Sequence, residues 1–180
     1  MTARSHYVAG WRIDLDRRTG PRLVSAAGLA RLVAAALGAA GAPAPASIGL
    51  ILTDDAALAA LNREHMGVDG PTDVLSFPLL PPSAFPSHAG RPAAGLTPAP
   101  RFALPPGRRP HLGDVVVSVE RAIAQADEGR GGHTGSVRWS PADELRLLAV
   151  HGVLHVCGWD HAEAVEGDAM RALERRLLGQ

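Results

Sequence analysis

Three of the eight histidines in this chain lie between positions 151 and 161, and their spacing suits a metal site. If this segment is helical, His151 and His155 lie one turn apart, so both imidazoles project from the same face and can bind one ion. Gly158 can end such a helix in the left-handed conformation, and the chain can then turn back to bring His161 to the pair. The sequence therefore predicts a transition-metal centre with three imidazole ligands.

The nearest thiol does not supply a fourth ligand. Cys157 lies two residues after His155 and points well around the helix from the histidine face, so we interpret it as a small buried residue. Zinc in catalytic sites typically has three protein ligands and a water molecule, whereas structural zinc is usually held by four protein ligands. We therefore predict an open site for one Zn²⁺ ion, although imidazole also suits nickel, copper and iron. Its bound water, with a pKa lowered to about 7, would attack a substrate or deprotonate a neighbouring hydroxyl group.

The residue after the first histidine narrows the reaction. In metalloproteases with the HExxH motif this residue is a glutamate that acts as the general base. Here the position is Gly152, which has no side chain to move a proton. The difference argues against a peptidase and favours hydrolysis of another bond or cleavage of a phosphodiester.

The composition fits a single domain over residues 1–180. The chain has 180 residues, of which 46% are hydrophobic, and this is enough for one core. Its single cysteine permits no disulfide within the chain, and the N-terminus lacks the pattern of a secretory signal. No apolar run is long enough to span a membrane, so we expect a cytoplasmic protein. Because the formal net charge is +0, any contact with RNA must be local.

Capping residues and apolar spacing indicate the elements that would position the histidines. The predicted strands are 11–15, 47–52, 74–78 and 112–119. The predicted helices are 25–37, 54–66, 120 to about 128, 140 to about 157, and 163–178. In the histidine helix, Leu147, Val150 and Leu154 form an apolar stripe, which predicts a helix packed in the core with its histidines facing a cleft.

Two segments outside the histidine helix carry further predictions. The last helix is expected to bury one apolar face, made of Val165, Ala169, Leu173 and Leu177. Many prolines between Leu79 and His111 exclude helix and central strand across most of that segment. We predict one long surface loop over about 79–111, inserted into the domain, because the elements on both sides are needed for one sheet.

Two motifs precede the histidine run. The first is Leu61-Asn62 followed by residues 70–78, with the sequence GPTDVLSFP, and the second is residues 112–118, with the sequence LGDVVVS. In their order and spacing, from about residue 48 to the C-terminus, the three motifs resemble the YbeY endoribonucleases, also called rRNA maturation factors. The resemblance is more specific than the histidine spacing alone because three separate motifs agree.

The resemblance implies an α+β, zincin-like domain with a small mixed sheet and a metal-bearing helix packed against it near the C-terminus. It implies zinc bound by His151, His155 and His161. It also implies a single-strand-specific endoribonuclease that matures the 3′ terminus of 16S rRNA and takes part in late-stage 70S ribosome quality control. The expected partners are ribosomal RNA precursor and the ribosome, with a ribosomal protein or a GTPase as a candidate protein partner. Neither DNA nor a membrane is expected.

The chain departs from the family pattern at Met66, where many members carry an arginine that could neutralise a phosphate. Arg63, one helical turn earlier, is a candidate substitute or else a solvated surface charge. Asp73, Ser76 and Asp160 are candidates to orient the water or to bind RNA. Each of these three could equally form a cap, turn or strand-edge hydrogen bond.

Two other functions stay open alongside the nuclease. One is a ribosome-assembly factor in which the metal only holds the last two helices together, and the other is a metal-dependent peptidase-like hydrolase. For the nuclease itself, the phosphorus is attacked either directly or through the adjacent 2′-hydroxyl group. The two routes leave different RNA ends.

Overall fold

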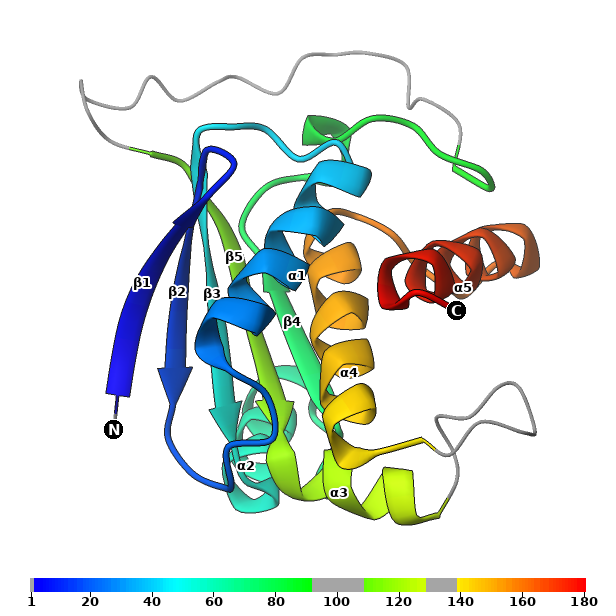
Figure 1. Cartoon of the computed structure of the whole chain (residues 1–180). Helices are drawn as coiled ribbons and strands as arrows, with labels where there is room; N and C mark the ends of the chain where they lie inside the picture. The colour runs from blue at the N-terminus through cyan, green and yellow to red at the C-terminus, as the bar shows by residue number, and fades with distance from the viewer. Residues whose placement is uncertain (1, 92–108, 129–138) are drawn as a thin grey trace.

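A five-stranded mixed sheet forms the frame of the chain in the computed structural model, which describes residues 2–91, 109–128 and 139–180 (Figure 1). Its spatial order is β1-β2-β3-β5-β4, so β4 lies at one edge. The strands β2, β3 and β5 run parallel, whereas β1 and β4 each pair antiparallel with a neighbour. The bounds are β1 Thr2–Val8, β2 Trp11–Arg17, β3 Ala46–Thr53, β4 Val74–Pro78 and β5 His111–Ser118.

Helices cover both faces of this sheet. Their bounds are α1 Ala26–Ala39, α2 Asp55–Met66, α3 Val119–Asp127, α4 Pro141–Val156 and α5 Ala164–Leu178. α1 and α4 lie over one face and share the main core with β2, β3 and β5, while α5 lies outside α4 (Figure 1). On the other face, Leu58 of α2 packs in a smaller cluster with Leu75 and Val116. The predicted α+β class, with the histidine helix against a small mixed sheet, is confirmed.

The predicted helix starts are confirmed by their caps. The Ser25 side chain accepts a hydrogen bond from the Gly28 N–H, and Asp54 does the same for Ala57. Ser140 and Asp143 form a reciprocal capping box at the start of α4. Such caps satisfy N–H groups that have no partner inside the helix, which is why these residue types locate helix starts from the sequence alone.

Strand β1 was not predicted, and the buried face of α5 was predicted only in part, since Leu173 is buried and Leu177 packs against the core. The side chains of β1 are mostly exposed, so its sequence lacks the apolar alternation that identifies a half-buried strand. In α5, Val165 is 64% exposed. Besides Leu173, the residues that α5 buries are Glu166, Gly167, Met170 and Glu174, none of which was predicted. Two glutamates occupy this face because they bind histidines elsewhere in the chain.

The expected surface loop over 79–111 needs correction in its first part. Pro82–Ala84 form a short 3-10 helix, Phe85 is buried, and His88 pairs with Arg91 in an isolated bridge. Positions 92–108, which hold most of the prolines in this segment, lie outside the described residues. Within the part of the chain that the structure describes, no helix is long and apolar enough to cross a bilayer.

α4 approaches the sheet most closely at Gly152. A Cβ atom at this position would lie 2.4 Å from Val115 Cγ1 and 3.1 Å from Val74 Cγ2. The backbone carbonyl of Gly152 also accepts a hydrogen bond of 3.0 Å from the Ser76 hydroxyl on β4. Only glycine therefore allows α4 to lie at this distance from β4 and β5.

We expect Gly152→Ala to destabilise the metal-free protein by about 1–3 kcal/mol, because the added methyl group overpacks the helix–sheet contact. Urea unfolding measures the change. The matched control is Gly167→Ala in α5, where the nearest atoms would lie 3.4 Å from the new Cβ. This control should gain roughly 0.5–1 kcal/mol from helix propensity. Equal stability of the two variants would contradict the close packing at Gly152.

Candidate metal centre

The structure brings the three predicted ligands together. Each of His151, His155 and His161 offers one ring nitrogen, and these nitrogens all lie within 4.8 Å of one another. The Nε2 atoms of His151 and His155 are 3.0 Å apart. Since zinc–nitrogen bonds are about 2.0–2.1 Å long, one ion can reach all three nitrogens after small side-chain adjustments. The residues present therefore fit a metal ion.

The end of α4 and the turn after it produce this convergence. His151 and His155 lie one turn apart on α4, as predicted, and Cys157 caps the helix. Gly158 then takes the left-handed conformation with a φ of 83°. In the turn that follows, the backbone N–H of His161 donates to the carboxylate of Asp160 at 2.7 Å. The predicted glycine stop and return of the chain are confirmed.

Cys157 is not a ligand in this arrangement. Its side chain is 1% exposed, and burial raises the pKa of the thiol to about 12. A neutral thiol is a poor metal ligand, because binding requires the thiolate. The prediction that Cys157 is a small buried residue is confirmed.

A buried carboxylate fixes the orientation of the first ligand. Glu174 on α5 lies 2.8 Å from His151 Nδ1, and its side chain is 9% exposed. Because an ionised carboxylate only accepts hydrogen bonds, His151 Nδ1 carries the hydrogen and Nε2 keeps a lone pair for the ion. The sequence prediction did not include Glu174. The signal that could have found it is the stripe Glu166, Met170 and Glu174, whose members are four residues apart on one face of α5.

A second group of contacts holds the turn that carries His161. We call this group the turn clamp, and it consists of His88, Arg91, Trp159 and Glu166. The His88 ring stacks on the Trp159 ring with centroids 3.8 Å apart. His88 Nε2 lies 2.7 Å from Glu166 Oε1, which also accepts from the Asp160 N–H at 2.9 Å. Arg91 donates to the Gly158 carbonyl group.

Glu166 is the centre of the turn clamp. Burial alone would raise the pKa of its carboxyl group, but hydrogen bonds from His88 and the Asp160 backbone lower that pKa overall, helped by the charges of His88 and Arg91. An ionised Glu166 can therefore hold the turn and His88 at once. The clamp joins the connection between β4 and β5 to the turn that positions His161.

Comparison with known proteins places the chain in a family. A family model described as "Endoribonuclease YbeY" matches residues 23–180. The chain belongs to the YbeY family. An "Endoribonuclease YbeY" of Moorella thermoacetica is 40% identical over 163 residues, covering 91% of this chain and 89% of the relative. One from Salinispora tropica is 44% identical over 133 residues, covering 74% of this chain and 73% of the relative.

A solved structure agrees with the fold. The solution structure of a Thermotoga maritima protein superposes with a TM-score of 0.53 at 20% identity, covering 94% of this chain and 89% of that one. At this identity the likeness concerns the fold alone. It agrees with the mixed sheet and the helices described above.

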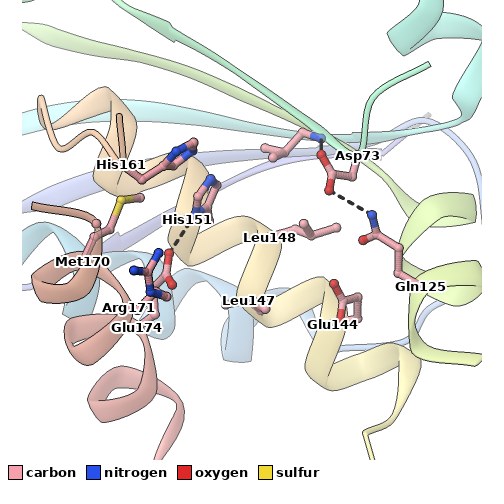
Figure 2. A pocket seen from close by; sticks show the side chains of 12 residues that line it. Asp73, Gln125, Glu144, Leu147, Leu148, His151, His161, Met170, Arg171 and Glu174 are labelled. Atoms are coloured by element: carbon pink, nitrogen blue, oxygen red, sulfur yellow. Dashed lines mark hydrogen bonds and ion pairs between the residues drawn. The ribbon is translucent and has the colours of Figure 1, made fainter. Parts of the chain in front are cut away.

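Two hollows flank the histidines in this YbeY-family chain. One, of about 390 Å³, is bordered by β4 and the residues just before it. The other, of about 330 Å³, lies between α3, α4 and α5, and Figure 2 shows its lining. His151, His161 and Asp73 line both hollows. The metal centre thus lies between two spaces that a substrate can enter.

The four other candidate residues lie in different surroundings. Asp73 borders both hollows, and its carboxylate accepts hydrogen bonds from the Val74 N–H at 2.8 Å and from Gln125 Nε2 at 3.0 Å. Ser76 borders the hollow beside β4, but its hydroxyl donates to the backbone carbonyl of Gly152 on α4. Asp160 is exposed at the turn, and the N–H of His161 is the main reason that its pKa is lowered. Arg63 borders neither hollow and pairs with exposed Asp69 at 2.7 Å.

The turn clamp predicts that His88 controls metal affinity without binding the metal. His88→Ala should weaken Zn²⁺ binding by up to about 10-fold, because the turn that carries His161 loses its stacking and carboxylate contacts. Direct partners of metal ligands contribute about 10- to 100-fold, so a contact further from the ion should lie at the lower end. Competition against a chromophoric chelator measures the affinity. His65→Ala is the control, since His65 lies on α2 against the Phe77 ring. Unchanged affinity in a folded His88→Ala protein would show that the clamp does not position the turn.

The metal-free protein should lose stability in acid. Burial lowers the pKa of His155 from 6.5 to about 4, with the charges of His151 and His161 adding to the effect. The unfolded chain therefore binds a proton more readily than the folded chain between these values, and stability falls as pH drops from 6.5 towards 4. Urea unfolding across this range should show the fall, and a smaller one in His155→Gln. An identical pH dependence in both proteins would contradict this account.

Proposed function

We propose that this chain is a zinc-dependent endoribonuclease that cuts single-stranded RNA. The observation that carries the proposal is the open three-histidine centre between two hollows, in a chain whose relatives are named endoribonucleases. The substrate would be ribosomal RNA precursor in the cytoplasm. The activity would mature the 3′ terminus of 16S rRNA and act in late-stage 70S ribosome quality control, with a ribosomal protein or a GTPase as a candidate partner. Residues 1–180 would act as one domain, with 79–111 as an insertion.

A bound Zn²⁺ ion would supply polarisation of a phosphate oxygen and a water molecule of lowered pKa. The chain itself supplies the three imidazoles. Glu174 selects the tautomer of His151, and burial keeps His155 unprotonated at neutral pH. The turn clamp holds the segment from which His161 projects.

Asp73 is the side chain best placed to orient the attacking group. Its backbone and side-chain partners fix the carboxylate at a position that borders both hollows beside His151 and His161. A carboxylate there can accept a hydrogen bond from a water molecule or from the 2′-hydroxyl group of the substrate. The Asp73 carboxylate accepts hydrogen bonds from the Thr72 hydroxyl, the Val74 N–H and Gln125 Nε2, so the residue would keep its orientation during the reaction.

The contacts of the other candidates favour structural roles. Ser76 ties β4 to α4, Asp160 braces the ligand turn, and Arg63 forms an exposed ion pair. Met66, where many family members have arginine, is 51% exposed on α2. Phosphate contacts in this chain would therefore differ from the arginine contact that the family pattern suggests.

The packing at Gly152 bears on the peptidase alternative. A glutamate at this position, as in HExxH enzymes, would require α4 to move away from Val115. The chain thus has neither the side chain nor the space for that general base. The remaining alternative, an assembly factor with a structural metal, becomes an outcome of the following experiment.

The proposed activity is tested with ribosomal RNA precursor that carries a single-stranded 3′ extension. We expect cleavage by the zinc-loaded protein, loss of cleavage after chelation, and recovery when Zn²⁺ is restored. His151→Ala should lower the rate by about 100-fold or more, because a ligand of the reactive ion is lost. End-group analysis separates the two routes, since a 2′,3′-cyclic phosphate requires attack by the adjacent 2′-hydroxyl group.

Asp73→Asn provides a second arm with its own control. This variant should bind zinc normally and cleave at least about 10-fold more slowly, whereas Asp69→Asn, at an exposed position, should match the wild type. If the zinc-loaded wild type does not cleave, and His151→Ala unfolds the protein, the metal has a structural role and the proposed activity is wrong.

A further inference from the structure

The hollow between α3, α4 and α5 has a lining that suits one particular part of an RNA substrate. We call it the α5 pocket. We propose that the α5 pocket binds an unpaired nucleobase next to the scissile phosphate and favours bases that carry an amino group over uracil. This inference rests on the proposed function, because it assigns a part of the substrate to a space beside the metal centre.

The position of the α5 pocket fits a nucleotide adjacent to the cleaved bond. His151 and His161 line both the pocket and the hollow on the other side of the metal centre. A phosphate held at the histidines therefore places its neighbouring nucleoside at the mouth of the α5 pocket. The volume of about 330 Å³ lies within the range of pockets that bind small organic groups, roughly 300–1,000 Å³.

The walls of the α5 pocket are largely apolar. Leu147 and Leu148 project from α4, and Met170 comes from α5 (Figure 2). Val74 of β4 also lines the pocket. The faces of an unpaired base can pack against such side chains, as they do in enzymes that act on extruded bases. A methionine thioether also makes favourable contacts with aromatic rings. A flat aromatic group therefore fits this space better than a sugar or a phosphate.

The polar edge of the α5 pocket is rich in hydrogen-bond acceptors. Asp73 can only accept, so its hydrogen bond with Gln125 Nε2 at 3.0 Å fixes which way the amide faces. The carbonyl oxygen of Gln125 consequently points away from Asp73 (Figure 2). Glu144 and Glu174 also line the pocket, although Glu144 Oε2 accepts from Trp139 Nε1 and Glu174 Oε1 pairs with His151 Nδ1. Three carboxylates on its border disfavour a phosphate group inside it.

Arg171, the one arginine among the described lining residues, does not offset the excess of hydrogen-bond acceptors at the pocket edge. Arg171 forms an ion pair of 2.6 Å with Asp168, and its side chain is 46% exposed. An acceptor-rich edge matches the exocyclic amino groups of adenine, cytosine and guanine, because carboxylates and amide oxygens accept from them. Uracil presents two carbonyl groups and a single N–H on its pairing edge. The carbonyl oxygens of uracil would therefore face the carboxylate and amide oxygens of the pocket, and neither group can donate a hydrogen bond.

Direct binding tests the proposal without relying on cleavage. The chain has 3 methionines, so methyl-labelled methionine gives a simple spectrum in which Met170 reports on the α5 pocket and exposed Met66 is an internal control. Adenosine and cytidine should shift the Met170 signal of the zinc-loaded protein, and uridine should shift it at least about fivefold less at the same concentration. Inorganic phosphate should leave Met170 unchanged.

Cleavage of RNA with randomised nucleotides around the cut provides the second readout. Sequencing of the new ends should show uracil depleted about fivefold or more at one adjacent position in the wild type. Gln125→Leu should reduce that depletion, and Gln180→Leu, at the exposed C-terminal residue, should not. Leu147→Trp narrows the pocket from a half-buried position and should lower both nucleoside binding and cleavage while zinc affinity stays unchanged.

The outcomes separate this inference from the proposed activity. Cleavage without base preference, with no Met170 shift from any nucleoside, would overturn the base site but still support the proposed nuclease activity. A Met170 shift from phosphate alone, or an equal shift from uridine, would also overturn it. Nucleoside binding with the stated preference in a protein that cuts no RNA would support the pocket and reject the proposed function.

Discussion

The close contact between α4 and the sheet at Gly152 determines where the other parts of the site can lie. Because no Cβ atom fits between α4 and Val115, the helix lies directly on β4 and β5, and the Ser76 hydroxyl fastens its backbone there. His151 and His155 consequently lie beside the edge strand β4, next to the two hollows. The same packing explains why this site has no glutamate after its first histidine. Gly152 thus both sets the position of α4 on the sheet and removes the general base of an HExxH peptidase.

α5 contributes to the site through buried charge. Glu166 and Glu174, taken as whole residues, are each 6% exposed. Burying a carboxylate costs several kcal/mol unless it is well hydrogen-bonded. Each glutamate has a histidine partner, one at the metal centre and one in the turn clamp. Glu174 therefore holds α5 on α4 through His151, and Glu166 joins α5 to the connection between β4 and β5 through His88. Met170 adds α5 to the apolar core. Loss of either histidine would leave a buried acid without its main partner.

The sequence predicted features that depend on neighbouring residues and missed those that depend on distant ones. The caps at Ser25, Asp54 and Ser140 and the three ligands could be predicted because each signal lies within a few positions. Strand β1 lacks an apolar pattern, since its side chains are mostly exposed. The buried glutamates of α5 were missed because polar residues normally face solvent. Pairing of His88 with Glu166 joins residues 78 positions apart, and no local pattern encodes it.

The turn clamp has a consequence for how such a protein can change during evolution. His88 and Arg91 touch the turn that carries His161, yet neither supplies a ligand to the metal centre. Substitutions between β4 and β5 can therefore adjust how firmly the third ligand is held while the histidine motif stays the same. Two chains with identical metal ligands can then differ in how readily they exchange the ion. Adaptation to scarce or abundant metal would be found in the connection before β5, outside the motif that identifies the site.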